Sequence, residues 1–252
     1  MTIRSPADAD TAAAATARDF ATAVAAAWRS QLGANLLNVS LIGSLAHGGF
    51  SRRYSDIDVA VVTESGLDAA ALDQLRAIAV ATSEELARKL SIFWTDRAFT
   101  VGRFPPLDRV DVLDHGVTLF GRERLMPERP PLDEIRRYLC GKPYETWAQS
   151  ADRFAAIEAL EPQSHKSYLR AHLYPARFVF SFMTGRMGSN DDAVEWLKGH
   201  IIPGLDVALI AAALDCRRAA ADPDALFAAR TALPRQVAAC TALIRDSEAE
   251  RP

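Results

Sequence analysis

Cysteine is scarce in this chain of 252 residues, and long apolar runs are absent. The three cysteines, Cys140, Cys216 and Cys240, show no C-x-x-C spacing and do not reach the density of a disulfide-rich secreted scaffold. We therefore expect reduced thiols in a cytoplasmic protein. No apolar run approaches the roughly 18 residues that a membrane span requires, so no membrane partner is expected.

An excess of basic charge is also missing. The chain has 29 Lys and Arg against 32 Asp and Glu, a net charge of -3 at pH 7. Because nucleic-acid binding needs a basic surface, this balance argues against a nucleic-acid partner. The N-terminal stretch is acidic early and has no uninterrupted apolar region, so we expect no signal peptide. The length allows one large domain or two small ones.

Residues 37–62, LNVSLIGSLAHGGFSRRYSDIDVAVV, carry the clearest functional pattern. The pattern predicts a strand at 38–42, a Gly-Ser turn, a short helix at 45–48, a loop and a second strand. At Gly43 a turn can bring backbone N–H groups close to an anion. The hydroxyl of Ser44, at the start of the short helix, would face the same phosphate.

Two carboxylates, Asp56 and Asp58, begin the second predicted strand, 56–62. Side chains at i and i+2 of a strand point the same way, and two like charges so close repel unless a cation lies between them. Oxygen ligands suit Mg²⁺, which takes one or two carboxylates together with substrate phosphates. The pattern therefore predicts a phosphate and metal site. The alternative is a phosphate-free turn followed by a strand with a solvated end.

The pattern GS-x3-G-x6-SDID followed by an apolar strand resembles the signature of the DNA polymerase β-type nucleotidyltransferase superfamily. Within it, the chain resembles the aminoglycoside (streptomycin/spectinomycin) adenylyltransferases. The resemblance implies that Gly43, Ser44 and Ser55 bind the nucleotide and that Asp56 and Asp58 ligate Mg²⁺. It implies transfer of a nucleoside monophosphate, AMP from ATP in those enzymes, to a hydroxyl of a small molecule such as an aminoglycoside.

One feature of the resembled family is missing. A third carboxylate usually projects from the next strand as metal ligand or general base. The strand predicted here at 90–94 offers Leu90, Ser91 and Phe93, none of which can do this. Asp96, just past the strand, is the substitute we consider, although Asp is also a favoured turn residue.

Residues 107–119 predict a short helix followed by a strand through 120. Asp111, Asp114 and His115 suggest a metal site, but helical spacing favours exposed charges instead.

The domain prediction is an α/β (α+β) nucleotidyltransferase core with a small mixed sheet at 1–125, followed by an all-α helical bundle at 126–252 that binds the substrate. In the core, Phe20, Val24 and Trp28 mark an amphipathic helix at 8–32, and a longer helical pattern runs over 67–89. The segment 121–131, GRERLMPERPP, is the predicted junction.

Helices are predicted in the second half at 132–140, 144–160, 164–183, 190–200, 205–220 and 223–248. Pro175 predicts a kink or break. The pattern TG-x-x-x-S-x-x-x-A-x-x-W is similar to a turn and helix in the substrate domain of the same adenylyltransferases, and it covers Thr184, Gly185, Ser189, Ala193 and Trp196.

A basic stripe is predicted on the 164–183 helix. Lys166, Arg170 and Arg177 lie at near-helical spacing, and such groups can neutralise phosphate charge. Lys166 and Arg170 are therefore candidate nucleotide-binding residues, or they pair with surface acids. Two alternatives to the small-molecule transferase stay open: a non-catalytic or regulatory nucleotide-binding protein that lost its third carboxylate, and a protein-directed transferase of the toxin–antitoxin type.

Overall fold

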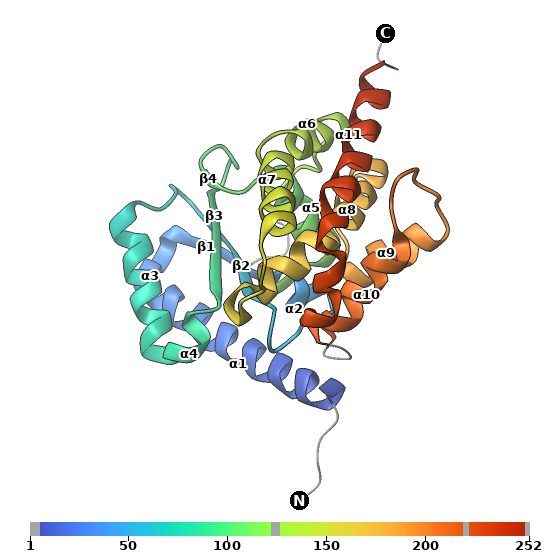
Figure 1. Cartoon of the computed structure of the whole chain (residues 1–252). Coiled ribbons are helices and arrows are strands. Elements are labelled where there is room, and N and C mark those ends of the chain that lie inside the picture. Colours follow the sequence, from blue (N-terminus) through green and yellow to red (C-terminus); the bar gives the residue numbers. More distant parts are fainter. Residues whose placement is uncertain (1–5, 122–126, 219–221, 250–252) are drawn as a thin grey trace, which may run out of the picture. The chain divides into compact units, whose positions relative to one another are not determined.

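The computed structural model describes residues 6–121, 127–218 and 222–249. It divides into two compact units, 1–130 and 131–252, which are described separately (Figure 1). The boundary between the units falls after Pro130, against residue 125 in the sequence prediction. Part of the predicted junction, 122–126, lies outside the described residues.

The first unit is built on a five-stranded mixed sheet with the order β4-β3-β2-β1-β5. Its strands are β1 (Leu36–Ile42), β2 (Ile57–Thr63), β3 (Leu90–Asp96), β4 (Gly102–Arg103) and β5 (Val117–Gly121). The strands β2 and β3 run parallel, and the other neighbours are antiparallel. The predicted fold class, a small mixed sheet followed by a helical region, is confirmed.

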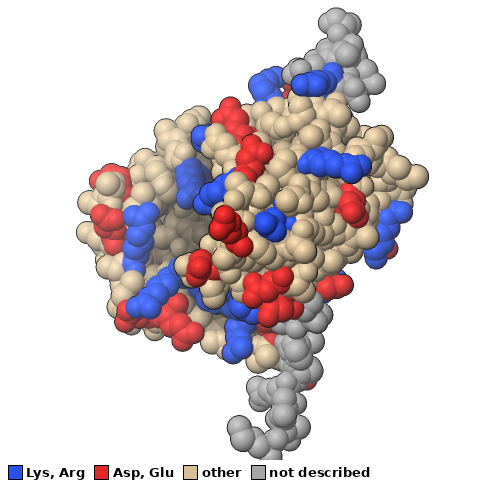
Figure 2. Space-filling model, in the orientation of Figure 1, with Lys and Arg blue, Asp and Glu red and all other residues tan. Residues whose placement is uncertain are grey.

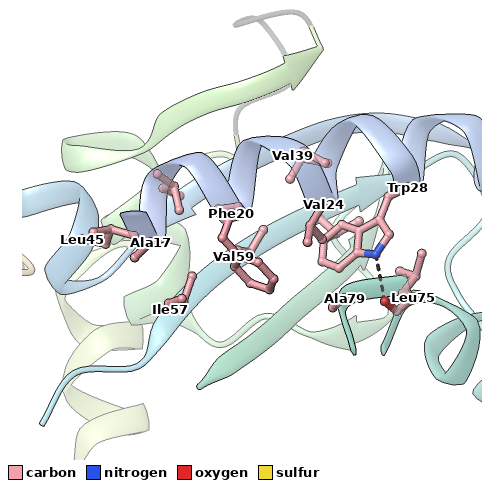
Figure 3. Close-up of a cluster of buried hydrophobic side chains, with 14 of the residues drawn as sticks. Ala17, Phe20, Val24, Trp28, Val39, Leu45, Ile57, Val59, Leu75 and Ala79 are labelled. Atoms are coloured by element: carbon pink, nitrogen blue, oxygen red, sulfur yellow. Dashed lines mark hydrogen bonds between the residues drawn. The ribbon is translucent and has the colours of Figure 1, made fainter. Parts of the chain in front are cut away.

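One face of the sheet is covered by α1 (Pro6–Leu32) and α3 (Ala69–Thr82). Figure 3 shows Phe20, Val24 and Trp28 of α1 lying against the strands, as the i, i+4, i+8 spacing predicts. Trp28 is fully buried, and its indole N–H donates to the Leu75 carbonyl of α3 at 2.9 Å. This bond satisfies the polar atom of a large side chain that the core would otherwise bury unpaired.

The opposite face of the sheet carries α5 (Pro106–His115). Its residue Val112 packs with Ile42 of β1 and Ala60 of β2. Since residues two apart on a strand share a face, Asp58 points to the same side as Ala60. The helix α5 therefore lies on the face of the sheet that bears the aspartate of β2.

The helical pattern predicted at 67–89 forms two helices, α3 and α4 (Glu84–Ala87). Between them Ser83 has an extended backbone, with φ -163° and ψ 112°, and its hydroxyl accepts from the Leu86 N–H. A serine in this conformation begins a new helix instead of continuing the old one. After α1, Gly33 opens a single 3₁₀ turn, η1 (Gly33–Asn35).

Among the described residues of the second unit, helices are the only regular elements. Its helices are α6 (Leu132–Cys140), α7 (Lys142–Ala156), α8 (His165–Thr184), α9 (Asn190–Lys198), α10 (Val207–Arg217) and α11 (Leu233–Ala249), with 3₁₀ segments η2 (Pro162–Ser164) and η3 (Pro223–Ala232).

Two helix predictions in this unit need correction. The helix α8 continues through Pro175, which the sequence marked as a kink or break. By contrast, the single helix predicted at 223–248 is divided into η3 and α11, and Pro234 is the second residue of α11. Proline removes an N–H and crowds the preceding turn, which explains a change of helix type at this position. As predicted, Ser189 caps α9, in a reciprocal capping box with Asp192.

The charges on the molecular face shown in Figure 2 are mixed. Lys and Arg side chains alternate there with Asp and Glu, instead of forming one field of a single sign. Among the described residues, no helix combines the length and the apolar character needed to cross a lipid bilayer.

Candidate functional site

The site begins at the turn that follows β1. Gly43 has φ +66° and ψ -158°, a combination that is open almost only to glycine. A Cβ on Gly43 would lie 2.5 Å from Oδ2 of Asp58, far inside van der Waals contact. The absence of a side chain therefore allows the Gly-Ser turn to lie directly against the aspartate of β2.

Both polar groups of Gly43 are used. Its N–H donates to Oδ2 of Asp111 at 2.7 Å. Its carbonyl accepts from the N–H groups of Ala46 and His47, at 2.9 and 3.1 Å, and so closes the one-turn helix α2 (Ser44–His47). The geometry of the turn is thus set from β2, from α5 and from α2.

The next residue, Ser44, is connected to the start of β2 through Ser55. The Ser44 hydroxyl donates to the Ser55 hydroxyl at 3.0 Å, and that oxygen also accepts from the Ser51 N–H at 2.9 Å. Ser55 is only 3% exposed and directly precedes Asp56. The structure therefore brings Gly43, Ser44 and Ser55 together, with Ser55 buried as a support for Ser44.

Asp56 and Asp58 flank the fully buried Ile57, and both are half-buried. Asp56 directly precedes β2, and Asp58 pairs with Ile42 of β1 and Ser91 of β3. Among the described residues there is no group of three or more His, Cys, Asp or Glu suited to a metal. Two adjacent carboxylates of partial exposure fit a hard cation such as Mg²⁺ whose remaining ligands are substrate phosphates and water.

The sheet register places Asp96 away from this pair. Asp58 lies beside Ser91, whereas Asp96 lies beside Thr63, five residues further along the strands. At about 3.3 Å per residue the separation is roughly 16 Å, so the sequence hypothesis that Asp96 replaces the third carboxylate is not supported.

Asp96 instead organises its own turn. Its carboxylate accepts from the N–H and hydroxyl of Thr100, at 2.7 and 2.8 Å, and from the N–H of Val101. The backbone hydrogen bond from Thr100, helped by those from the Thr100 hydroxyl and the Val101 N–H, lowers the pKa of Asp96. A lowered pKa weakens a general base, and it agrees with the alternative role as a turn residue.

Asp111 is the residue that the sequence interpretation missed. We expected an exposed charge, but Asp111 is 1% exposed and is bonded to Gly43. The available signal was its position between two valines, Val110 and Val112, both of which are buried. The other two residues of that group are half-buried and not exposed as expected: Asp114 pairs with Arg129, and His115 contacts the ring of His47 edge to face.

The basic candidates Lys166 and Arg170 both belong to α8 of the second unit. They are one helical turn apart; Lys166 is half-buried and Arg170 is exposed. Arg177, on the same helix, is half-buried and contacts the sulfur of Met187 at 3.8 Å. A role for these residues in nucleotide binding stays a prediction.

With its mixed sheet followed by a helical region, the chain has the fold of a solved nucleotidyltransferase, as the sequence pattern predicted. The particular structure that shows this is spectinomycin adenyltransferase AAD(9) from Enterococcus faecialis, solved with ATP and spectinomycin. The match has a TM-score of 0.57 at 14% sequence identity, and it covers 87% of this chain and 98% of that one. At this identity the match shows the fold alone, and in fold the chain resembles the aminoglycoside adenylyltransferases.

A second similarity is partial. A mutant of the toxin–antitoxin complex MntA–HpeT matches at 19% identity over 47% of this chain and 87% of that one. Its TM-score of 0.30 is too low to support an argument about this chain. No protein-family model and no curated protein matches the sequence.

Proposed function

We propose that the protein is a Mg²⁺-dependent nucleotidyltransferase that moves AMP from ATP to a hydroxyl of a small molecule. The observation that carries this proposal is the contact between the Gly43 turn and Asp58, because it puts a Gly-Ser turn of the kind that can bind phosphate beside a candidate metal ligand. The fold shared with an adenyltransferase supports it.

Each residue has a role in the proposal. Gly43 would shape the phosphate turn, because its own N–H and carbonyl are already bonded to Asp111 and α2. The Ser44 hydroxyl and the backbone N–H groups that follow Gly43 would hold the β- and γ-phosphates, while Ser55 supports Ser44. Asp56 and Asp58 would hold Mg²⁺, which when bound neutralises charge on the phosphates and on the leaving pyrophosphate. A role for Lys166 and Arg170 of α8 in nucleotide binding, through their positive charge, belongs to the proposal as well.

The proposed acceptor is a small molecule that presents a hydroxyl group. Spectinomycin is the first compound to test, because AAD(9) was solved with it and this chain covers almost the whole of AAD(9). Modification of an aminoglycoside-type antibiotic is therefore the specific form of the proposal. A cytoplasmic location belongs to the proposal as well and rests on the cysteine content alone.

A second candidate function is a regulatory nucleotide-binding protein that does not catalyse transfer. The observation that favours it is Ser91, which lies beside Asp58 in the sheet register at the edge where the resembled family carries a carboxylate. A serine hydroxyl cannot accept the proton of the attacking hydroxyl at neutral pH, whereas a carboxylate can.

The experiment measures transfer of label from ATP, with and without Mg²⁺, to a panel of spectinomycin, streptomycin and other aminoglycosides, with a cell lysate beside it. Wild type is compared with Asp56→Ala/Asp58→Ala and with Asp73→Asn, a control at an exposed carboxylate of α3.

The proposal is supported if wild type and Asp73→Asn form a labelled small-molecule product and the double variant does not. Label on a protein of the lysate would instead support the protein-directed alternative. Binding of Mg-ATP that the double variant loses, without any labelled product, would leave the regulatory protein. A wild type that neither binds nor uses ATP would refute both.

A further inference from the structure

We propose that Asp111 is a positioning residue, which holds the Gly43 turn in the conformation that aligns Ser44 with Asp58. This inference rests on the proposed function. Three observations carry it: Asp111 is 1% exposed, its Oδ2 accepts from the Gly43 N–H at 2.7 Å, and its Oδ1 has no hydrogen-bond partner among the described residues.

Stability alone does not explain this carboxylate. Asp111 lies between Val110, which is 0% exposed, and Val112, which is 5% exposed. A buried carboxylate with a single hydrogen bond is costly, and an apolar side chain of similar volume is often neutral or stabilising in its place. The bond to Gly43 is the interaction that an apolar side chain could not reproduce.

The bond has a geometrical effect at the site because Asp111 and Asp58 contact the same glycine. Asp58 packs where a Cβ of Gly43 would be, and Asp111 binds the N–H of the same residue. The conformation of Gly43 is only one of several that are open to glycine, so surrounding contacts must select it. Without Asp111, the turn would lose one of the groups that fix it, and the Gly43 N–H would be left without its acceptor.

A shift of Gly43 would pass directly to Ser44. The Gly43 carbonyl accepts the two hydrogen bonds that close α2, and Ser44 is the first residue of that helix. The backbone at Asp111 is held in place because α5 packs through Val112 against Ile42 and Ala60, on the face of the sheet that bears Asp58. Asp111 thus connects a fixed helix to the turn that would carry the phosphate contacts.

Asp111 would act through Gly43 and not on the substrate. Its side chain is enclosed, and Gly43 already occupies one of its oxygens. A carboxylate in direct contact with a triphosphate would repel it, so we expect no direct contact between Asp111 and the phosphates. The expected role of Asp111 is to keep the side chains of Ser44 and Asp58 in a fixed position relative to each other.

The test compares Asp111→Asn, Asp111→Leu and the control Asp114→Asn, which changes an ion-paired carboxylate on the same helix. Kinetics are measured with Mg-ATP and the identified acceptor, and melting temperature is measured beside them. We expect Asp111→Leu to keep its melting temperature and to lose kcat/KM by about tenfold to a hundredfold, the effect of a small misplacement of reacting groups. Asp111→Asn keeps an oxygen acceptor for the Gly43 N–H, so we expect it to recover most of that loss.

A folded Asp111→Leu variant with wild-type kcat and KM would overturn the proposal. So would an Asp111→Asn variant that is as impaired as Asp111→Leu, because the retained acceptor would then be irrelevant. If Asp111→Leu does not fold, an Asp111→Asn variant with impaired kcat/KM or with faster exchange of the Gly43 amide would still overturn the proposal.

A second readout does not depend on activity. Hydrogen exchange of the Gly43 amide is followed by NMR in nucleotide-free protein labelled with ¹⁵N-glycine. We expect Gly43 to be protected in wild type and in Asp111→Asn, and to exchange faster in Asp111→Leu. Equal exchange in all three proteins would overturn the proposal. If the three proteins show the expected exchange but wild type does not bind ATP, the proposed function is refuted instead.

Discussion

Gly43 and Asp58 are in contact across the site: a Cβ on Gly43 would lie 2.5 Å from the Asp58 carboxylate oxygen. We therefore predict that Gly43→Ala abolishes Mg-ATP binding, because the added methyl must displace the turn or the aspartate. The strain at φ +66° adds about 1–3 kcal/mol of lost stability. Isothermal titration with Mg-ATP and a melting curve measure the two effects.

The control for this prediction is Gly33→Ala. Gly33 also has a positive φ, +55°, but no atom lies within 4 Å of the position of its Cβ. This variant should lose some stability from backbone strain and still bind Mg-ATP normally. Equal binding by the two alanine variants would show that the contact with Asp58 has no role in the site.

For Asp96 we predict that substitution has almost no effect on catalysis. Because it lies at the far end of β3 from Ser91, the neighbour of Asp58, Asp96→Asn should leave kcat and KM within about twofold of wild type. It should lower stability slightly, since the turn at Thr100 loses a charged acceptor. A large fall in kcat with unchanged stability would contradict the placement derived from the register.

His172 predicts how the stability of the helical unit depends on pH. It is fully buried, neither ring nitrogen has a partner among the described residues, and burial lowers its pKa to about 4. The unfolded chain takes up a proton near pH 6.5 and the folded chain does not. Stability should therefore fall as the pH drops from about 6.5 to about 4, by roughly 3 kcal/mol in total.

Urea unfolding between pH 4 and 8 measures this effect, with His172→Leu as the test variant and His200→Gln as the control at an exposed histidine. The unfolding free energy of His172→Leu should change less with pH over this range than that of wild type. If His172→Leu and wild type lose stability in parallel below pH 6.5, the histidine is not the group responsible.

The thiols should differ in reactivity. Burial raises the pKa of Cys240 to about 12 and also raises the pKa of Cys216, whereas Cys140 is only half-buried. Because the thiolate is the reactive form, only the Cys140 thiol should react quickly with a colorimetric disulfide reagent at pH 8. All three thiols should react after denaturation. A fast-reacting thiol that persists in Cys140→Ser would contradict this assignment.

Trp28 tests the core beneath the sheet (Figure 3). Trp28→Phe keeps an aromatic ring but loses the buried N–H donor to Leu75, so we expect a loss of about 1–2 kcal/mol in unfolding free energy. Trp28→Ala should cost about 3–5 kcal/mol. Val80→Ala, at a half-exposed position of α3, serves as the control and should change stability by less than about 0.5 kcal/mol.

The local parts of the fold could be predicted because neighbouring residues determine them. The two strands around the Gly-Ser turn and the helix that contains Trp28 follow from alternation and from spacing along the chain. The two-residue strand β4 was not predicted, because it is too short to have a period of its own. The division at Ser83 also escaped prediction, since serine is compatible with helix interiors and caps alike.

The site could be predicted only as far as the sequence keeps its residues close together. Gly43, Ser44, Asp56 and Asp58 belong to one strand–turn–strand segment. Asp96 was misplaced because the register between β2 and β3 cannot be read from either strand alone. Asp111 was missed because its burial depends on α5 packing on the sheet, and the sequence reports only its charge.

The parallel register of β2 and β3 puts the side chain at position 91 next to Asp58, on the same side of the sheet. A single substitution at this position would therefore replace a hydroxyl by a carboxylate beside the aspartate pair. In this scaffold, gaining or losing a catalytic base needs no change of backbone. A nucleotide sensor and a transferase could then differ at this one residue of the scaffold, and Ser91→Glu is the variant by which that difference could be tested.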